Sequence, residues 1–412
     1  MELVWNPPLK SRQKRILPLL GTLCIITPFA VDMYLPAFSA IAAGYRTTTP
    51  QISLSLSTYF IGFALGQVLY GPLLDRFGRK RPLYFGLAVY IVFSIGCALA
   101  PNLRSFAAFR FLEALGGCVA QVAAIAMVHD FFQVKESAKI FSLLFLMIGT
   151  SPLLAPTIGS AVMGALGWPW IFGLLAAIAF LVLALVFLLL PEGHAPDRGV
   201  SLRPAPILAE FRDIAKDPQF LTYTLAGAFS FAGLFAFVAG SPIIFMDGFH
   251  LGARAFGLVF AVLVMGFIGG SQANVFLLRR FGSRQIFLTA LSLQVLIGIC
   301  FLAAIYSGIA GLKSVLVLFF AFLSCIGLTF PNAAALALAR FSRNAGRASA
   351  LFGFLQNGAG ALISVGIGML GAHAVFLLLA STSMAGLAIL AAGQRRIGET
   401  VDEPECEAAL IL

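Results

Sequence analysis

Twelve apolar stretches of helix length, separated by short polar connections, dominate the sequence. They fall at about residues 16–38, 52–74, 83–100, 105–128, 140–163, 169–190, 220–246, 254–277, 286–307, 314–337, 348–371 and 373–393. A helix needs roughly 20 apolar residues to cross a bilayer. Only 11% of the 412 residues are charged, whereas a water-soluble chain is about 25% charged. The sequence therefore predicts an all-α membrane protein with 12 transmembrane helices.

A long polar segment divides these stretches into two groups of six. It is rich in proline and in charged residues and covers residues 191–219. We expect an N-terminal six-helix bundle at 1–190, a cytoplasmic linker at 191–219, a C-terminal bundle at 220–393 and a cytoplasmic tail at 394–412.

Basic residues are concentrated on one side of the predicted crossings. Of the 27 Lys and Arg residues, 22 lie in the terminal segments and the even-numbered connections, and four lie in the odd-numbered connections. Cytoplasmic loops carry such an excess, so both termini are predicted to be cytoplasmic. The net charge of +10 comes from these short connections, which argues against a nucleic-acid partner.

A short segment after the second stretch occurs again after the eighth. Leu74-Asp75-Arg76-Phe77-Gly78 corresponds to Leu278-Arg279-Arg280-Phe281-Gly282. The repeat indicates a duplicated six-helix unit, with its halves related by a pseudo-two-fold axis along the membrane normal. Duplication of this kind is typical of transporters.

Several motifs resemble a known family. Residues 71–82, GPLLDRFGRKRP, resemble the loop 2-3 signature of the major facilitator superfamily. Residues 32–37 (DMYLPA), 110–117 (RFLEALGG), 330–333 (FPNA) and 348–356 (ASALFGFLQ) resemble its bicyclomycin and chloramphenicol resistance (Bcr/CflA) branch. The resemblance implies a monomeric drug:proton antiporter of the bacterial inner membrane that works by alternating access.

Two motifs depart from the family pattern. Glu113 stands where the family usually has Gln, so a neutral group has become ionisable; this favours cationic or zwitterionic substrates. The helix 5 antiporter motif, which here also contains Pro152, retains Pro156 and Gly159, but three of its glycines are Ser or Ala, among them Ala155. Small residues still predict a face along which two helices approach closely and rock.

Three charged residues lie well inside the predicted crossings: Asp32, Arg110 and Glu113. A charge at mid-membrane costs on the order of 2.5 to 3.5 kcal/mol, so such residues need a function. Arg110 and Glu113 share a helix face with Gly117 and Gln121, a stripe expected to line an aqueous cavity. One proton neutralises the trio, which predicts proton coupling. Asp32 and Glu113 are both candidate carriers, with Asp32 favoured by the resemblance; a purely structural ion pair is the alternative.

Pro36 lacks the N–H that would bond to the carbonyl of Asp32. The freed oxygen is expected either to take up water or a substrate donor, or simply to mark a kink. Further residues predict a largely apolar substrate pocket with few polar groups. They are Tyr34, Gln121, Met147, Phe231, Phe235, Asn332, Gln356 and Asn357.

The loop after the second stretch predicts a conformational latch. Gly71 permits close helix approach, Gly78 permits a tight turn, and Asp75 can bind a facing helix N-terminus. The resemblance implies that this loop ties helix 2 to helix 11 in the outward-open state. Arg76 and Arg79 are either part of this latch or serve only the positive-inside bias.

The interpretation is a proton-coupled exporter of small amphipathic compounds, antibiotics among them. Its partners are the substrate, protons and membrane lipid. No Walker-type loop occurs and the cysteines lack metal-ligand spacing, so no cofactor or metal is expected. The nearest alternative is an exporter of one metabolite, such as a sugar or amino acid. A membrane enzyme or a channel fits less well, because the crossings lack a metal cluster, a nucleophile beside a base and a ring of like charges.

Overall fold

The computed structural model describes residues 9–132, 134–192, 196–197, 204–308, 311–341 and 345–397. Every regular element in these ranges is a helix. The first half comprises α1 (Leu9–Asp32), η1 (Leu35–Ala37), α2 (Phe38–Gly44), α3 (Thr49–Phe77), α4 (Lys80–Ala98), α5 (Leu103–Phe131), α6 (Val134–Leu166) and α7 (Pro169–Leu189). The second half comprises α9 (Pro218–Pro242), η2 (Ile243–Gly248), α10 (Ala253–Leu277), α11 (Ser283–Tyr306), α12 (Leu312–Leu338), α13 (Ala345–Leu370) and α14 (Ala372–Ile397).

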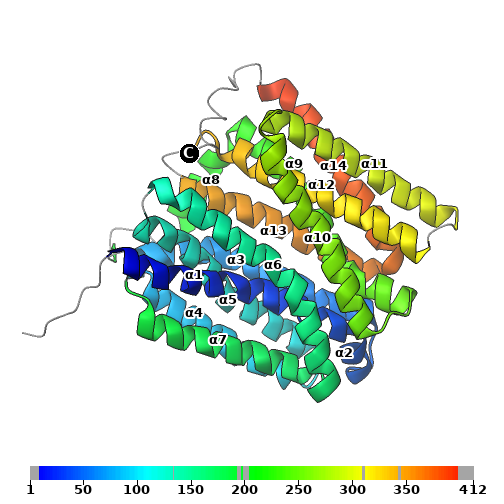
Figure 1. Ribbon diagram of the computed structural model, residues 1–412, viewed down its shortest axis with the longest axis horizontal. Helices are drawn as coiled ribbons and strands as arrows, with labels where there is room; N and C mark the ends of the chain where they lie inside the picture. Colours follow the sequence, from blue (N-terminus) through cyan, green and yellow to red (C-terminus); the bar gives the residue numbers. More distant parts are fainter. Residues whose placement is uncertain are drawn as a thin grey trace, which may run out of the picture.

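The crossings agree with the sequence prediction. Among the described residues, eleven segments are long and apolar enough to span a membrane. The twelfth is α6, a helix of 33 residues; some of its side chains are not among those that the structure describes. The two groups of helices lie side by side, with α1 to α7 below α9 to α14 in Figure 1.

The linker contains a helix that the sequence prediction lacked. α8 (Pro204–Ala215) packs against α9 and α13, and Glu210 forms a 2.8 Å ion pair with Arg347. Residues 193–195 and 198–203 of the predicted linker lie outside the described residues, as do residues 398–412 of the predicted tail. The boundaries at 190, 219 and 393 stay a prediction.

The first crossing is broken rather than continuous. α1 ends at Asp32, the one-turn helix η1 follows, and α2 completes the crossing. Pro36 lies in η1, where its missing N–H removes the bond that would carry the helix past Asp32. Pro18 and Pro28, by contrast, lie inside α1. The break places Asp32 at the C-terminal end of a helix.

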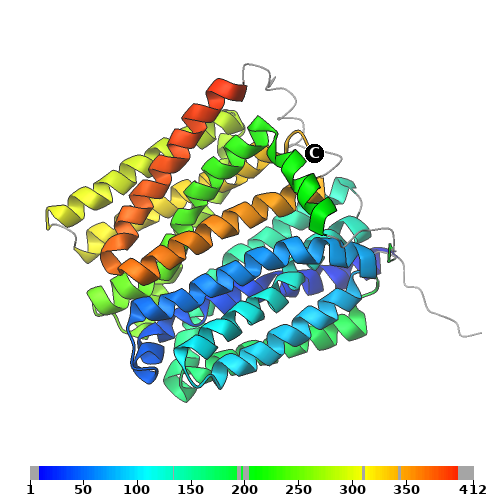
Figure 2. The same cartoon turned by 180° about the vertical axis from the view of Figure 1, so that it is seen from behind.

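The two halves meet along two helix pairs. α3 packs against α13 and α6 against α10, and Figure 2 shows α13 (orange) running beside α3 (blue). Ser57 Oγ donates to Ser364 Oγ at 2.8 Å in the buried part of the first interface. Further along, Asn357 Nδ2 donates to Gln67 Oε1 at 3.3 Å. These neutral hydrogen bonds tie the halves together without burying a charge between them.

A disulfide between positions 57 and 364 is expected to lock the two halves. The hydroxyl oxygens are 2.8 Å apart, so cysteines at both positions place their sulfurs within bonding reach. The oxidised Ser57→Cys/Ser364→Cys protein should lose transport, and a reductant should restore it. Each single variant under the same oxidant is the control. Undiminished transport by the crosslinked protein would show that these helices need not separate.

Candidate functional site

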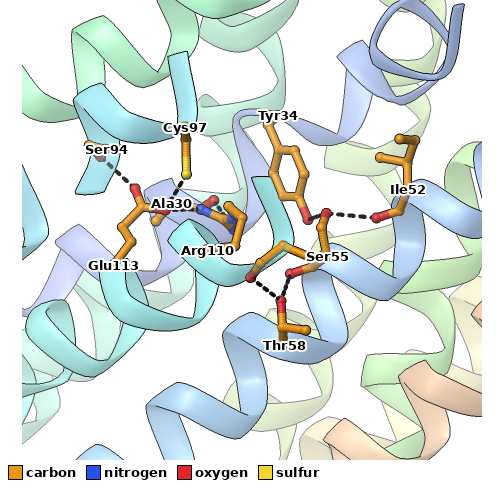
Figure 3. A network of polar contacts seen from close by, with 10 residues as sticks. Ala30, Tyr34, Ile52, Ser55, Thr58, Ser94, Cys97, Arg110 and Glu113 are labelled. Atoms are coloured by element: carbon orange, nitrogen blue, oxygen red, sulfur yellow. Dashed lines mark hydrogen bonds and ion pairs between the residues drawn. The ribbon is translucent and has the colours of Figure 1, made fainter. Parts of the chain in front are cut away.

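A buried ion pair lies in the middle of α5. Arg110 Nη1 and Glu113 Oε2 are 2.5 Å apart, and both side chains are fully buried (Figure 3). The spacing of three residues on one helix places the two groups on the same face. The predicted shared face is therefore present, and the ion pair on it has no net charge.

The glutamate is held by α4. Ser94 Oγ donates to Glu113 Oε1 at 2.5 Å, and Cys97 Sγ lies 3.8 Å from Glu113 Oε2. Together with Arg110, these contacts occupy both carboxylate oxygens. Hydrogen bonds to a charged partner such as Arg110 are shorter and stronger than those between neutral groups. Glu113 therefore offers no free negative charge to a ligand. The ion pair gives no reason to expect cationic substrates.

The guanidinium of Arg110 reaches α1 and lies against aromatic rings. Its Nη2 donates to the carbonyl of Ala30 at 3.0 Å. Its central carbon is 4.4 Å from the ring centre of Tyr34, 4.2 Å from that of Tyr59 and 5.6 Å from that of Phe172. Cation–π attraction of this kind strengthens where the cation is desolvated.

Asp32 is not part of this cluster. Its side chain is 4% exposed, yet its carboxyl makes no hydrogen bond or ion pair with any residue that the structure describes. Arg110 contacts α1 through the Ala30 carbonyl, and no described contact joins Asp32 to Arg110 or Glu113. The structure separates one neutral ion pair from one unpartnered acid.

Three of the four residues in the polar stripe of α5, Arg110, Glu113 and Gly117, are buried and not open to water. Arg110 and Glu113 are fully buried. A Cβ added at Gly117 would lie 2.7 Å from the Tyr90 ring on α4. Gln121 is half-buried. Spacing along one helix fixes which residues share a face, but it does not fix which neighbouring helix covers that face.

The predicted pocket residues fall in several places. Phe235 meets Phe60 of the other half edge to face, with ring centres 4.4 Å apart, and Phe231 stacks on Phe330 at 4.7 Å. A Cβ at Gly360 would lie 2.2 Å from the Phe235 ring, so glycine there allows this contact. Phe231 and Phe235 therefore belong to an aromatic cluster where the halves meet.

The predicted amide residues make separate contacts. Asn357 bonds to Gln67 of the first half, and Asn332 Nδ2 donates to Asn274 Oδ1 at 2.6 Å. Gln356 is buried, and its Nε2 donates to no described residue. Gln67 and Asn274 were missed by the sequence reasoning, although amide side chains inside apolar stretches are themselves a signal of function or close packing.

Two other predicted pocket residues are covered in this structure. Met147 packs over Gly21 of α1, where a Cβ would lie 2.2 Å from the Met147 sulfur. Tyr34 is fully buried, and its hydroxyl lies 3.4 Å from Ser55 Oγ. Tyr34 is thus closed to a ligand in this conformation, whereas Met147 is half-buried.

The loop after α3 forms a charged cluster at the end of the bundle where α8 lies. Arg79 donates to both oxygens of Asp130 on α5, at 2.8 and 3.3 Å, and to Asp75 at 2.7 Å. Burial lowers the pKa of Arg79, but the bonds and charges of Asp130 and Asp75 outweigh it and hold this pKa above its ordinary value. Glu192 accepts from the backbone N–H groups of Arg79 and Lys80 at 2.6 and 3.2 Å, which caps α4.

At the predicted latch, no described contact of Gly71 or Asp75 joins the two halves. The described partners of Asp75 are Arg79 and the backbone of Asp197 in the linker. Nothing lies within 4 Å of a Cβ built at Gly71, so the predicted close approach is not made. Gly78 has φ of 81°, the left-handed conformation that a tight turn demands of glycine. Arg76 lies against Phe77, 5.9 Å from the ring centre.

The antiporter motif of the fifth crossing lies on α6 and contacts both the α1 segment and α10. A Cβ at Gly159 would lie 1.8 Å from the backbone oxygen of Met33, at the break after Asp32. Pro156 lies against Gly257 of α10, and Ala155 is fully buried. Pro152 lies inside the same helix. The small-residue face therefore joins the acid-bearing break to the other half.

Replacing Gly159 with alanine is expected to cost about 1–3 kcal/mol, because the new methyl group meets backbone and cannot be accommodated by a side-chain rotation. Thermal unfolding of the purified protein should show a lower midpoint. Gly164→Ala, on the same helix with open space around it, is the matched control and should keep the original midpoint. Equal midpoints for both variants would contradict the close approach.

Comparisons with known proteins agree with the fold. Residues 20–365 match the family model of the Major Facilitator Superfamily. The chain is 30% identical to a bicyclomycin resistance protein homolog of Haemophilus influenzae, over 84% of this chain and 86% of that one. It is 31% identical to the multidrug resistance protein MdtL of Escherichia fergusonii, over 81% and 83%. It is 30% identical to the MFS-type transporter YdgK of Bacillus subtilis, over 92% and 96%.

Among solved structures, a D-xylose-proton symporter superposes with a TM-score of 0.72 at 14% identity, covering 95% of this chain and 98% of that one. At this identity the likeness concerns the fold alone. The family match covers most of the chain and agrees with its two groups of six crossings. This multi-pass membrane protein therefore belongs to the Major Facilitator Superfamily.

Proposed function

We propose that this chain is a drug:proton antiporter that exports small amphipathic compounds, antibiotics among them, by alternating access. The names of its relatives, which refer to bicyclomycin resistance and multidrug resistance, support export of drugs over export of a single metabolite. The proposal includes a monomer in the bacterial inner membrane with both termini cytoplasmic, supported by the distribution of basic residues.

The observation that carries the proposal is the unpartnered carboxyl of Asp32. It is 4% exposed and lies at the C-terminal end of α1, where the helix dipole disfavours an anion. A buried carboxyl without a partner is more stable with its proton bound. Asp32 is therefore our proposed proton carrier, and Glu113, already paired with Arg110, is not.

The distribution of acids supports a carrier in the first half. Between Pro218 and Gly398 the sequence contains a single acidic residue, Asp247. Asp247 is exposed at the end of the α9 crossing, where it accepts a hydrogen bond from Ser39 at 3.3 Å. The membrane-embedded part of the second half thus has no acid to carry a proton, and its role is to line the substrate path.

The proposed exchange requires that substrate and proton exclude each other. A drug entering from the cytoplasm reaches the interface between the halves near Phe231, Phe235, Asn332, Gln356 and Asn357. Its arrival favours loss of the proton from Asp32 toward the inside, and reloading from the outside resets the carrier. Inward proton flow then drives the drug outward.

Inverted membrane vesicles test this function. With an acidic interior, vesicles containing the protein should accumulate drugs such as bicyclomycin or chloramphenicol, and accumulation should collapse when a protonophore removes the gradient. Vesicles lacking the protein are the control. Accumulation of one sugar or amino acid, with no drug of a broad panel transported, would favour the single-metabolite exporter and contradict the proposal.

A further inference from the structure

The guanidinium of Arg110 lies between two tyrosine rings. Its central carbon is 4.4 Å from the ring centre of Tyr34 and 4.2 Å from that of Tyr59, and both tyrosines are fully buried. The two rings come from different elements, Tyr34 from the break after α1 and Tyr59 from α3. A cation held in this way is stabilised by the electron-rich faces of the rings.

The rings replace the hydration that burial removes. Nη1 of Arg110 bonds to Glu113 and Nη2 to the Ala30 carbonyl, while Nε has no hydrogen-bond partner among the described residues. Because an arginine cannot lose its charge in a protein, the ring faces are the remaining stabilisation available to it. Removing one ring therefore weakens the hold on the guanidinium without touching the ion pair itself.

Tyr34 also belongs to the segment that carries Asp32. It is two residues from Asp32 in the turn between α1 and η1. The residue between them, Met33, is fixed by its backbone contact with Gly159. The ring packs on Phe38 and Phe172, with centres 5.0 and 5.8 Å away. A change in this turn thus moves the acid and the ring together.

We infer that Tyr34 is a positioning residue of the proton site and not a substrate contact: its ring holds the Arg110 guanidinium on Glu113 and away from Asp32. This rests on the proposed function. While the ring is in place, Asp32 has no cation to pair with and keeps its proton. When the turn rearranges and the ring moves, the guanidinium can approach Asp32, and the carboxyl releases its proton.

The other charged and titratable groups around the guanidinium are few. Glu113 faces it from α5, Tyr59 from α3, and Tyr90 and Cys97 lie behind Glu113 on α4. The α7 segment Pro169–Leu189 contains no titratable residue, and neither do residues 143–166 of α6. Asp32 is thus the one acid near this site that lacks a partner among the described residues, so a shift in its titration reports on Arg110.

Infrared spectroscopy of the reconstituted protein tests this inference without a substrate. The carbonyl stretch of a protonated carboxyl is followed against pH, and the Asp32→Asn spectrum assigns the signal. Tyr34→Leu should move the midpoint to lower pH by about one unit, a tenfold loss of proton affinity, because the freed guanidinium stabilises the carboxylate. Tyr34→Phe keeps the ring and should restore the original midpoint.

Phe38→Leu is the matched control, since Phe38 packs on Tyr34 without touching the guanidinium, and it should leave the midpoint in place. Tyr59→Leu removes the other ring and should shift the midpoint in the same direction, which keeps the test available if Tyr34→Leu fails to fold. Unchanged midpoints in both leucine variants of the tyrosines, or an equal shift in Phe38→Leu, would overturn the inference. If no carboxyl signal disappears in Asp32→Asn, the proposed carrier itself is wrong.

Discussion

Asp32→Asn should abolish transport driven by a proton gradient while leaving the protein folded. An amide is close in size to a protonated carboxyl but cannot release a proton, so the variant should stay in the state that the protonated acid favours. Drug accumulation in inverted vesicles should fall to the level of vesicles without the protein. Counterflow of drug, which needs no net proton movement, should be reduced far less.

The matched control for this variant is Asp213→Asn. Asp213 is an exposed acid on α8, paired with Lys216 at 2.6 Å, and it lies outside the crossings. Its replacement should leave accumulation unchanged. Gradient-driven accumulation by Asp32→Asn at the original rate would remove Asp32 from the mechanism.

Breaking the Arg110–Glu113 pair should have the largest effect on stability. Glu113→Gln leaves a fully buried guanidinium without its counter-ion, which is expected to cost about 3–5 kcal/mol. Arg110→Leu should cost less, because a glutamate left alone can take up a proton whereas arginine cannot lose one. The free energy of unfolding, measured in a mixed-micelle denaturation series, compares the two variants.

The double variant Arg110→Leu/Glu113→Leu shows whether the two residues contribute to stability as a pair or independently. Replacing both charges with apolar groups is often nearly neutral in a protein interior, so the double variant should be more stable than Glu113→Gln alone. If the losses of the single variants Arg110→Leu and Glu113→Leu simply add in the double variant, the residues do not act as a pair.

The crossings and the interruption of the first crossing at Pro36 could be predicted from the sequence, because both depend on local chemistry. Apolar length fixes a crossing, and the missing N–H of Pro36 ends a hydrogen-bond ladder wherever the surrounding helices lie. The pairing of Arg110 with Glu113 was predictable for the same reason, since helix geometry alone brings residues three apart together. α8 was not predicted, because the charged residues around it indicated a linker; its packing against α9 and α13 stabilises it.

The surroundings of the charges could not be predicted in this way. Ser94 and Cys97 are ordinary small residues of α4, and nothing in their sequence spacing marks them as partners of Glu113. The placement of Tyr59 over Arg110 depends on how α3 packs against α5. The separation of Asp32 from the pair likewise depends on which atom of α1 the guanidinium meets, and that atom is the carbonyl of Ala30.

The number of protons exchanged per drug molecule tests the central claim most directly. It is obtained in proteoliposomes from the membrane potential and pH gradient at which net flux of a transported drug reverses. If Asp32 is the single carrier and Glu113 takes up no proton, one proton is exchanged per molecule. A value of two would mean that Glu113 also titrates, and it would contradict the account.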